Sequence, residues 1–272
     1  MSRLTHLTAA VATSIGALVV STASAQVDNT LFLHHFDAPI GAAPADADYA
    51  AGTASTPLVG GVINGSGAKF GAGAYDTTAG GRAHYIANDG NFDFSQGTVE
   101  FWIKKNAPWN DGVYRGFFGV HAAGVADFRI YKDGSNRLGF YAHGATSANI
   151  FGAQLAVADP PAPGQWHHIA VVWDSATDFK AIFLNGVDIG GDFGGAVTTV
   201  TGTIPAQMTI GAVQSGSGGG GHLYDEFRIS NIARYTSDFT PPTAPFVVPE
   251  PGALGLAGLL GAGLLARRGR RG

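Results

Sequence analysis

Short runs that alternate apolar and polar side chains recur from about residue 29 to residue 239, and each run is bounded by turn-forming residues. No apolar period of helical spacing is sustained for as long as three turns, which excludes long amphipathic helices. Gly supplies 41 of the 272 residues, about twice its usual share, and many of these glycines lie between the runs. The pattern predicts a many-stranded antiparallel sandwich or barrel.

Several segments indicate particular strands and turns. Residues 98–105 place apolar side chains at every second position, which is typical of a half-buried strand. Residues 165–174 are apolar on both faces, which predicts a central strand covered on two sides. Residues 128–131 and 138–141 flank a loop over residues 132–137, whose Asp-Gly and Asn tolerate the positive φ that a hairpin requires. Asn185-Gly186 is the preferred pair for a type I′ hairpin turn. Roughly ten to twelve strands fit the body, which favours an all-β, two-sheet antiparallel jelly-roll sandwich over an immunoglobulin sandwich.

The charge of the body excludes some partners. The chain contains no Cys, so disulfides, thiolate metal sites and a cysteine nucleophile are absent. The net charge is −4, but five of the 16 basic residues lie near the ends of the chain, which leaves 11 basic against 20 acidic residues. Such an acidic body disfavours nucleic acid as a partner and permits a hard cation.

The first 25 residues have the features of a secretory signal peptide. Arg3 precedes an apolar run over residues 7–20, and the small residues Ala23 and Ala25 stand before Gln26. This order is typical of a signal peptide with its cleavage site. We therefore expect Sec-dependent export and a mature chain that begins near Gln26.

The last 24 residues contain three successive features. Pro249-Glu250-Pro251 is followed by uncharged residues 252–266 and then by four arginines. A helix over those 15 residues would reach about 22 Å, short of a roughly 30 Å hydrocarbon core, so it would be a marginal anchor. The positive-inside rule keeps the arginines in the cytoplasm and the body on the far side of the membrane. The arginines are Arg267, Arg268, Arg270 and Arg271.

This tail resembles the PEP-CTERM sorting signal, and Pro249, Glu250, Pro251 and the four arginines are the residues that carry the resemblance. The resemblance implies processing by an exosortase, transient anchoring in the inner membrane of a Gram-negative bacterium, and an extracellular polysaccharide or biofilm setting. An ordinary C-terminal anchor with an accidental Pro-Glu-Pro is the alternative. The Pro-rich residues 241–248 are interpreted as an extended linker between the body and this tail.

The body resembles the laminin-G-like group of the concanavalin A-like lectin and glucanase fold. The matching segments occur in the family's order: Gly71–Asp76, Phe94-Ser95, Thr98–Ile103, Gly164–Trp173, Leu184–Gly186 and Tyr224–Ile229. The resemblance implies one jelly-roll domain over residues 26–240. It also implies binding of glycans, proteins or matrix, because most members of the family bind such ligands and do not catalyse a reaction. Fold alone does not fix function.

Catalytic motifs are missing from the body. Asp225 and Glu226 are neighbours on an expected strand, so their side chains should point to opposite faces and not form a glycanase pair. The Glu-x-Asp-x-x-Glu pattern of glycanases on this fold does not occur, nor do the zinc-protease, serine-hydrolase or phosphate-loop motifs. We predict no enzyme; the alternative is a glycoside hydrolase or lyase with a diverged site.

Two acidic residues are candidate calcium ligands. If the first and last strands lie side by side, Asp37 comes near Asp225, and carboxylate oxygens suit a structural Ca²⁺. The family resemblance makes such an ion conceivable. The alternative for Asp225 is a buried carboxylate that accepts backbone hydrogen bonds or pairs with Arg228 or Arg234.

Aromatic side chains in loops are candidate glycan contacts, since a flat ring can stack on a sugar. Trp109 and Tyr114 lie in a turn-rich segment and are the candidates for stacking. The alternative for Trp109 is a ring that folds back over the sandwich edge. Trp102, Trp166 and Trp173 lie on expected strands, and we assign them to the core.

These observations predict an exported, non-catalytic domain at the cell surface or in the extracellular matrix that binds glycan or matrix. A purely architectural domain with no specific ligand is a further alternative.

Overall fold

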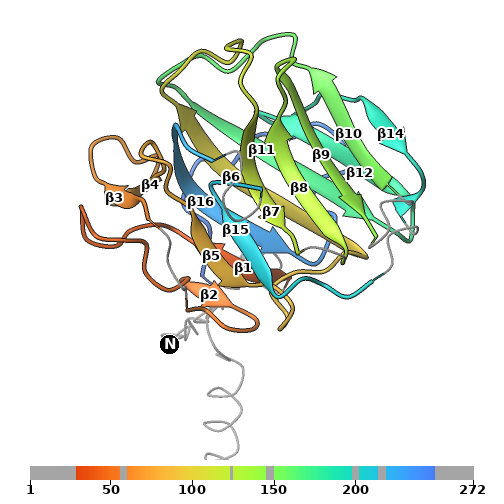
Figure 1. The fold of residues 1–272 in the computed structure, drawn as a ribbon, viewed down its shortest axis with the longest axis horizontal. Helices are drawn as coiled ribbons and strands as arrows, with labels where there is room; N and C mark the ends of the chain where they lie inside the picture. Colours follow the sequence, from red (N-terminus) through yellow and green to blue (C-terminus); the bar gives the residue numbers. More distant parts are fainter. Residues whose placement is uncertain are drawn as a thin grey trace, which may run out of the picture.

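The computed structural model describes residues 29–55, 60–122, 125–144, 150–197, 202–213 and 219–248. These residues form sixteen β-strands and no α-helix. The strands make two antiparallel sheets that pack face to face, and the seven-stranded sheet lies in front in Figure 1. The predicted two-sheet jelly-roll sandwich is confirmed. Five of the strands are only two or three residues long, too short to leave a pattern, so the sequence predicted fewer.

Nine strands form one sheet, in the order β13-β12-β11-β6-β16-β1-β2, with β4 beside part of β16 and β3 beside β4. The first and last strands, β1 and β16, are neighbours, with Leu33 opposite Arg228. The bounds are β1 (Thr30–His34), β2 (Tyr49–Ala50), β3 (Val62–Asn64), β4 (Ala74–Asp76), β6 (Gln96–Lys105), β11 (Trp166–Asp174), β12 (Phe179–Leu184), β13 (Val187–Asp188) and β16 (His222–Ser230).

The other seven strands form the second sheet, in the order β14-β10-β9-β8-β7-β15-β5. Its middle is a meander, since β7, β8, β9 and β10 follow one another in both sequence and space. The bounds are β5 (Ala83–Ile86), β7 (Arg115–Val120), β8 (Asp127–Lys132), β9 (Arg137–His143), β10 (Ile150–Ala156), β14 (Asp192–Gly194) and β15 (Gln207–Ile210).

The predicted hairpin turns are present. Asn185 and Gly186, between β12 and β13, both have positive φ, 52° and 81°, as a type I′ turn requires. A Cβ atom on Gly186 would lie 1.9 Å from the carbonyl oxygen of Phe239, so this position is restricted to glycine by contact as well as by conformation. Asn136, between β8 and β9, has a φ of 65°.

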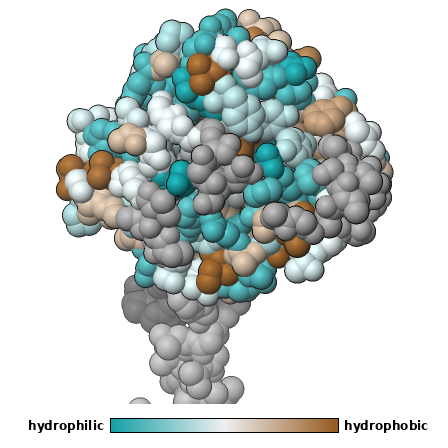
Figure 2. Space-filling model, in the orientation of Figure 1, coloured by the Kyte–Doolittle hydropathy of each residue, from teal (hydrophilic) through white to brown (hydrophobic). Residues whose placement is uncertain are grey.

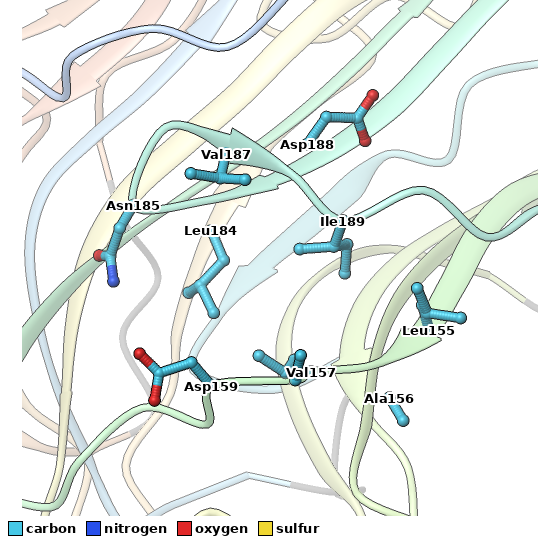
Figure 3. Close-up of a pocket in the computed structure, with 10 residues that line it drawn as sticks. Leu155, Ala156, Val157, Asp159, Leu184, Asn185, Val187, Asp188 and Ile189 are labelled. Atoms are coloured by element: carbon cyan, nitrogen blue, oxygen red, sulfur yellow. The ribbon is translucent and has the colours of Figure 1, made fainter.

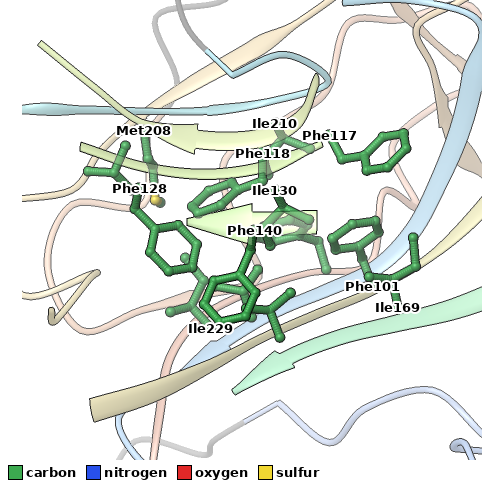
Figure 4. Packing of buried hydrophobic residues seen from close by; sticks show 14 of the residues in the cluster. Phe101, Phe117, Phe118, Phe128, Ile130, Phe140, Ile169, Met208, Ile210 and Ile229 are labelled. Atoms are coloured by element: carbon green, nitrogen blue, oxygen red, sulfur yellow. The ribbon is translucent and has the colours of Figure 1, made fainter. Parts of the chain in front are cut away.

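The main core fills the space between the two sheets. Figure 4 shows Phe101 and Ile169 of the nine-stranded sheet facing Phe118, Phe128 and other side chains of the seven-stranded sheet. Trp173 also lies in this core, 1% exposed, as predicted. At about 1.5 to 3 kcal/mol per buried large apolar side chain, this layer is the main source of stability.

A second, smaller cluster lies on the outer face of the nine-stranded sheet. Ala170, Val172 and Phe183 are buried there beneath Tyr235 and Phe239, whose rings stack 3.6 Å apart. We call residues 231–248, which cross this face, the C-terminal strap. Its cover explains why the central strand β11 is apolar on both faces.

The C-terminal strap corrects the expected end of the folded domain at residue 240. Residues 241–248 were interpreted as a linker that holds the body away from a membrane, but Phe246 is 6% exposed and packs on the domain. Its backbone N–H donates to Glu226 Oε2 over 2.7 Å. The folded unit therefore extends past residue 240, at least to Phe246.

Candidate functional site

The outer face of the seven-stranded sheet carries a cluster of aromatic and charged side chains. Alternation along β8 turns Phe128 and Ile130 into the core and Arg129 and Tyr131 to the outside. Tyr141 of β9 is directly opposite Arg129 in the strand register. Hydrophilic residues predominate over the middle of this side of the molecule in Figure 2. We call the cluster of Tyr114, Arg129, Tyr131, Tyr141 and His143 the tyrosine face.

The three tyrosine rings lie against one another. Tyr114 stacks on Tyr131 with ring centroids 5.7 Å apart, and Tyr131 meets Tyr141 edge to face at 5.6 Å. Tyr141 in turn stacks on the His143 ring at 5.7 Å. Tyr114 is 39% exposed, so the row is accessible at this end. Such a row offers flat apolar faces and hydroxyl groups side by side, the combination that recognises a sugar ring.

The hydroxyl groups of these tyrosines are neutral at pH 7. Burial raises the pKa of Tyr141 to about 12 and also raises the pKa of Tyr114 and of Tyr131. Each hydroxyl can therefore both donate and accept a hydrogen bond. Tyr131 already accepts one from Gln154 Nε2, at 3.1 Å.

One buried carboxylate organises the charged part of the face. Asp127 is 1% exposed, and its Oδ2 lies 2.5 Å from Arg129 Nη2, 3.2 Å from His121 Nδ1 and 3.3 Å from His143 Nε2. Burial lowers the pKa of Arg129, but the hydrogen bond and charge of Asp127 outweigh it and raise that pKa. The guanidinium is thus held charged, with its Cζ 5.6 Å from the Tyr141 ring centroid.

Of the two predicted glycan contacts, the structure places only Tyr114 in this cluster. Trp109 is 2% exposed, packs at 6.2 Å on Phe117 and donates its Nε1–H to the carbonyl oxygen of Asn136 at 2.8 Å. Its ring presents no free face to a sugar, so the expectation of glycan stacking is corrected for Trp109. The alternative, a ring folded back over the sandwich edge, describes what the structure contains.

Sequence reasoning missed Tyr131, Tyr141, Arg129 and His143. The runs 128–131 and 138–141 were interpreted only as flanks of a hairpin. The signal was present, because Tyr131 follows the core residue Ile130 and Tyr141 follows the core residue Phe140, on the face that turns away from the core.

The two candidate calcium ligands contact the same loop. Asp225 Oδ2 accepts the backbone N–H groups of Lys69 and Phe70, at 2.7 and 3.1 Å. Asp37 Oδ1 accepts those of Ala72 and Gly73, at 2.6 and 2.9 Å. Both acids thus accept backbone hydrogen bonds from residues 69–73, and the backbone alternative for Asp225 describes its Oδ2.

No metal centre is assembled by the described residues, among which no three His, Asp or Glu side chains gather with suitable geometry. Asp225 Oδ1 is buried and has no hydrogen-bond partner. Burial, reinforced by the charge of Glu226, raises the pKa of Asp225 to about 7, against the opposing hydrogen bonds from Phe70 and Lys69. Calcium binding at Asp37 and Asp225 stays a prediction.

An apolar pocket of about 380 Å³ lies at the edge of the sandwich, between the β12–β13 hairpin and the segment that follows β10. Figure 3 shows Leu184, Val187 and Ile189 turned toward Val157 across it, with Asp188 pointing away. Val187 is 55% exposed. The labelled residues place no cationic group in this pocket, so it lacks the mixed chemistry of the tyrosine face.

The targeting residues lie outside the described part of the chain. This holds for Ala23 and Ala25 of the expected cleavage site, for Pro249, Glu250 and Pro251, and for the four terminal arginines. Within the described ranges, no helix has the length and apolar character needed to cross a membrane.

Comparison with known families identifies the family of the domain. A family model of the laminin G type, described as the concanavalin A-like lectin/glucanases superfamily, matches residues 79–238. This span covers more than half of the chain and includes all strands of the tyrosine face. No curated protein matches the chain.

Solved structures share the fold at low sequence identity. The receptor binding domain of botulinum neurotoxin C/D mosaic serotype aligns with a TM-score of 0.56 and 9% identity, over 76% of this chain and 49% of that chain. The botulinum neurotoxin serotype D ligand binding domain, in complex with N-acetylneuraminic acid, gives 0.56 and 8%, over 76% and 48%. The binding domain of Paraclostridial Mosquitocidal Protein 1 gives 0.54 and 13%, over 76% and 50%. The chain spans about half the length of these structures, and the likeness concerns the fold alone.

Proposed function

The chain belongs to the concanavalin A-like lectin/glucanase superfamily, and we propose that it is an exported domain that binds glycans through the tyrosine face without converting them. The observation that carries this proposal is the row of Tyr114, Tyr131 and Tyr141 beside the fixed guanidinium of Arg129. Aromatic rings stack on the apolar faces of sugars, and a guanidinium with neutral hydroxyls supplies donors for sugar oxygens.

The neighbours in fold support the same class of ligand. One of them is a ligand binding domain solved with N-acetylneuraminic acid, and others are receptor binding domains. A carboxylated sugar of that kind would suit Arg129, whose guanidinium lies beside the Tyr141 ring.

Export is the second part of the proposal. The signal peptide that ends at Ala25 and the tail from Pro249 to Arg271 support passage through the Sec machinery and later processing by an exosortase. We propose that the domain acts at the cell surface or in the extracellular matrix, after transient anchoring through its C-terminal segment.

A carbohydrate-active enzyme is the second candidate, favoured by His143 and Tyr141 beside Arg129 on one face. The raised pKa of Tyr141 argues against it, because a tyrosine that acts as a base near pH 7 needs a lowered pKa. Incubating a bound polysaccharide with the purified chain separates the two candidates. New reducing or unsaturated ends that disappear in the His143→Ala variant would establish the enzyme.

The proposal is tested by screening the purified full chain on a glycan array and then measuring the affinity for the best ligand by calorimetry. Tyr141→Ala and Arg129→Gln should each weaken that affinity about tenfold, the effect of losing roughly 1.4 kcal/mol of contact. Tyr49→Ala, in β2 of the other sheet, is the matched control and should bind as the unaltered chain does. An empty array, or variants that bind as well as the original, would favour a purely architectural domain.

A further inference from the structure

A polar groove lies on the opposite side of the sandwich from the tyrosine face. It runs between the paired ends of β6 and β11 and the Thr240–Thr243 part of the C-terminal strap, with a volume of about 640 Å³. Its lining includes one lysine, Lys69, and two tryptophans, Trp102 and Trp166, and it contains no carboxylate. We call it the Trp166 groove.

Trp166 supplies an aromatic surface at this groove. Sequence reasoning assigned Trp166 to the core, but its side chain is partly exposed and its Nε1–H donates to the carbonyl oxygen of Gly67 at 3.1 Å. Lys104, directly opposite on β6, donates to the same oxygen at 2.8 Å and places its Nζ 5.0 Å from the indole centroid. The indole is therefore fixed at one edge, with an ammonium group beside it.

A second cation and ring lie next to the first pair. Lys69 Nζ lies 3.9 Å from the centroid of Trp102, a 6% exposed side chain on the outer face of β6. The backbone of Lys69 is itself fixed by its hydrogen bond to Asp225. Both ammonium groups thus lie over aromatic rings, an arrangement that holds each charge in place.

The charge of this groove is unbalanced. Among the residues that the structure describes, neither Lys69 nor Lys104 lies within ion-pair distance of a carboxylate, whereas Arg129 on the other face is paired with Asp127. The remaining lining is neutral, because burial lowers the pKa of His167 and outweighs its hydrogen bonds. An isolated positive site on a body with 11 basic and 20 acidic residues indicates an anionic ligand.

We propose that the Trp166 groove binds a carboxylate-bearing polysaccharide, with a sugar ring against Trp166 and uronate carboxylates at Lys104 and Lys69. An indole with one ammonium group beside it, and a second ammonium group over the Trp102 ring of the same groove, fits a chain in which sugar faces and carboxylates alternate. Duplex nucleic acid lacks exposed ring faces for Trp166 and is repelled by the net charge of the body. This site is separate from the tyrosine face and does not depend on the proposed function of that face.

The test uses polygalacturonate as the probe and affinity electrophoresis of the purified full chain at low ionic strength. Binding should be strong for polygalacturonate and at least tenfold weaker for its fully methyl-esterified form, which keeps the backbone and loses the charge. Added salt should weaken the binding, as for other exposed charges. Equal retardation by both polymers, or by duplex DNA, would overturn the proposal.

Substitutions locate the site. Trp166→Ala, Lys69→Gln and Lys104→Gln should each weaken the binding of polygalacturonate by roughly three- to tenfold. Lys180→Gln removes the same charge outside the groove and should leave the binding unchanged, provided that the thermal midpoints of all variants match. The Lys variants keep the test decisive if Trp166→Ala lowers stability.

The outcome is separable from that of the proposed function. Tyr141→Ala removes a ring from the tyrosine face only, so it should bind polygalacturonate as the unaltered chain does. If Tyr141→Ala abolishes this binding and the three groove variants do not, the anionic polymer binds the tyrosine face and the groove proposal is wrong.

Discussion

The ring of Phe246 lies over the guanidinium of Arg228, with Arg228 Cζ 3.8 Å from the ring centroid. Arg228 is 2% exposed and donates through Nε and Nη2 to Glu100 Oε1 of the neighbouring strand, at 2.9 and 2.6 Å. The strap therefore seals a buried ion pair from solvent. Removing the Phe246 ring would expose the ion pair of Arg228 and Glu100 to solvent.

We expect Phe246→Ala to lower the free energy of unfolding by about 3 kcal/mol, because it removes a buried aromatic ring and uncovers Arg228. Val247→Ala is the matched control, since Val247 is 61% exposed. It should change stability by less than about 0.5 kcal/mol. Denaturant titration of both variants measures the difference. Equal stability would mean that the strap does not belong to the folded unit.

Glu100 should make the domain sensitive to acid. Burial alone would raise its pKa, but the charge of Arg228 and the hydrogen bond of His168 lower it to about 2. A carboxylate with a lowered folded-state pKa stabilises the fold above its ordinary value of 4.5, and this contribution is lost as the pH falls from 4.5 toward 2.

The free energy of unfolding of Glu100→Gln should therefore fall less steeply between pH 4.5 and pH 2 than that of the unaltered chain. It should also cost about 3 to 5 kcal/mol at neutral pH, because Arg228 stays buried without its partner. Chemical unfolding at a series of pH values gives both quantities. An unchanged slope between pH 4.5 and pH 2 would contradict the assigned role of Glu100.

Asp225 should affect the pH dependence of stability in the opposite direction from Glu100. Burial raises its pKa from 3.8 to about 7, so the folded state keeps a proton that the unfolded state releases. The contribution of this group to the free energy of unfolding falls as the pH rises from 3.8 to about 7 and is level above that range. Asp225→Asn should abolish the decline. Asp159→Asn, at an exposed position, should leave it in place.

Bound calcium should offset the loss of stability that comes from ionising the buried Asp225. We expect added Ca²⁺ to raise the thermal midpoint of the full chain by several degrees relative to a chelator, because a ligand of the folded state stabilises it by mass action. The Asp37→Asn, Asp225→Asn double variant should lose this rise. Comparing each protein with and without calcium removes any effect of the substitutions on stability itself. A flat response of the unaltered chain excludes the predicted ion at the concentrations used.

The fold could be predicted from the sequence because its strands leave periodic patterns. The alternation over residues 98–105 lies within β6, and the two-sided apolar run became β11. Asn185-Gly186 fixes its hairpin by local conformation alone, which needs no knowledge of distant residues. Strands of two or three residues, such as β13, depend on pairing partners and could not be predicted.

The candidate site was harder to predict because it depends on which face a ring occupies. Trp109 lies in a turn-rich segment yet packs into the core, since Asn136, 27 residues away, accepts its indole N–H. Trp166 begins an apolar strand, yet it lies at the strand end next to an open groove. Exposure is decided by segments far apart in the sequence, so composition around a ring does not reveal it.

The strap also gives the domain a defined orientation toward anything fastened to its end. Phe246 holds the chain against the outer face of the nine-stranded sheet, so a tether that continues from residue 248 starts on that side. A domain held by such a tether would turn the tyrosine face outward, away from the attachment surface, and keep the Trp166 groove beside it. One side would then be available to soluble glycans and the other to polymer lying close to that surface.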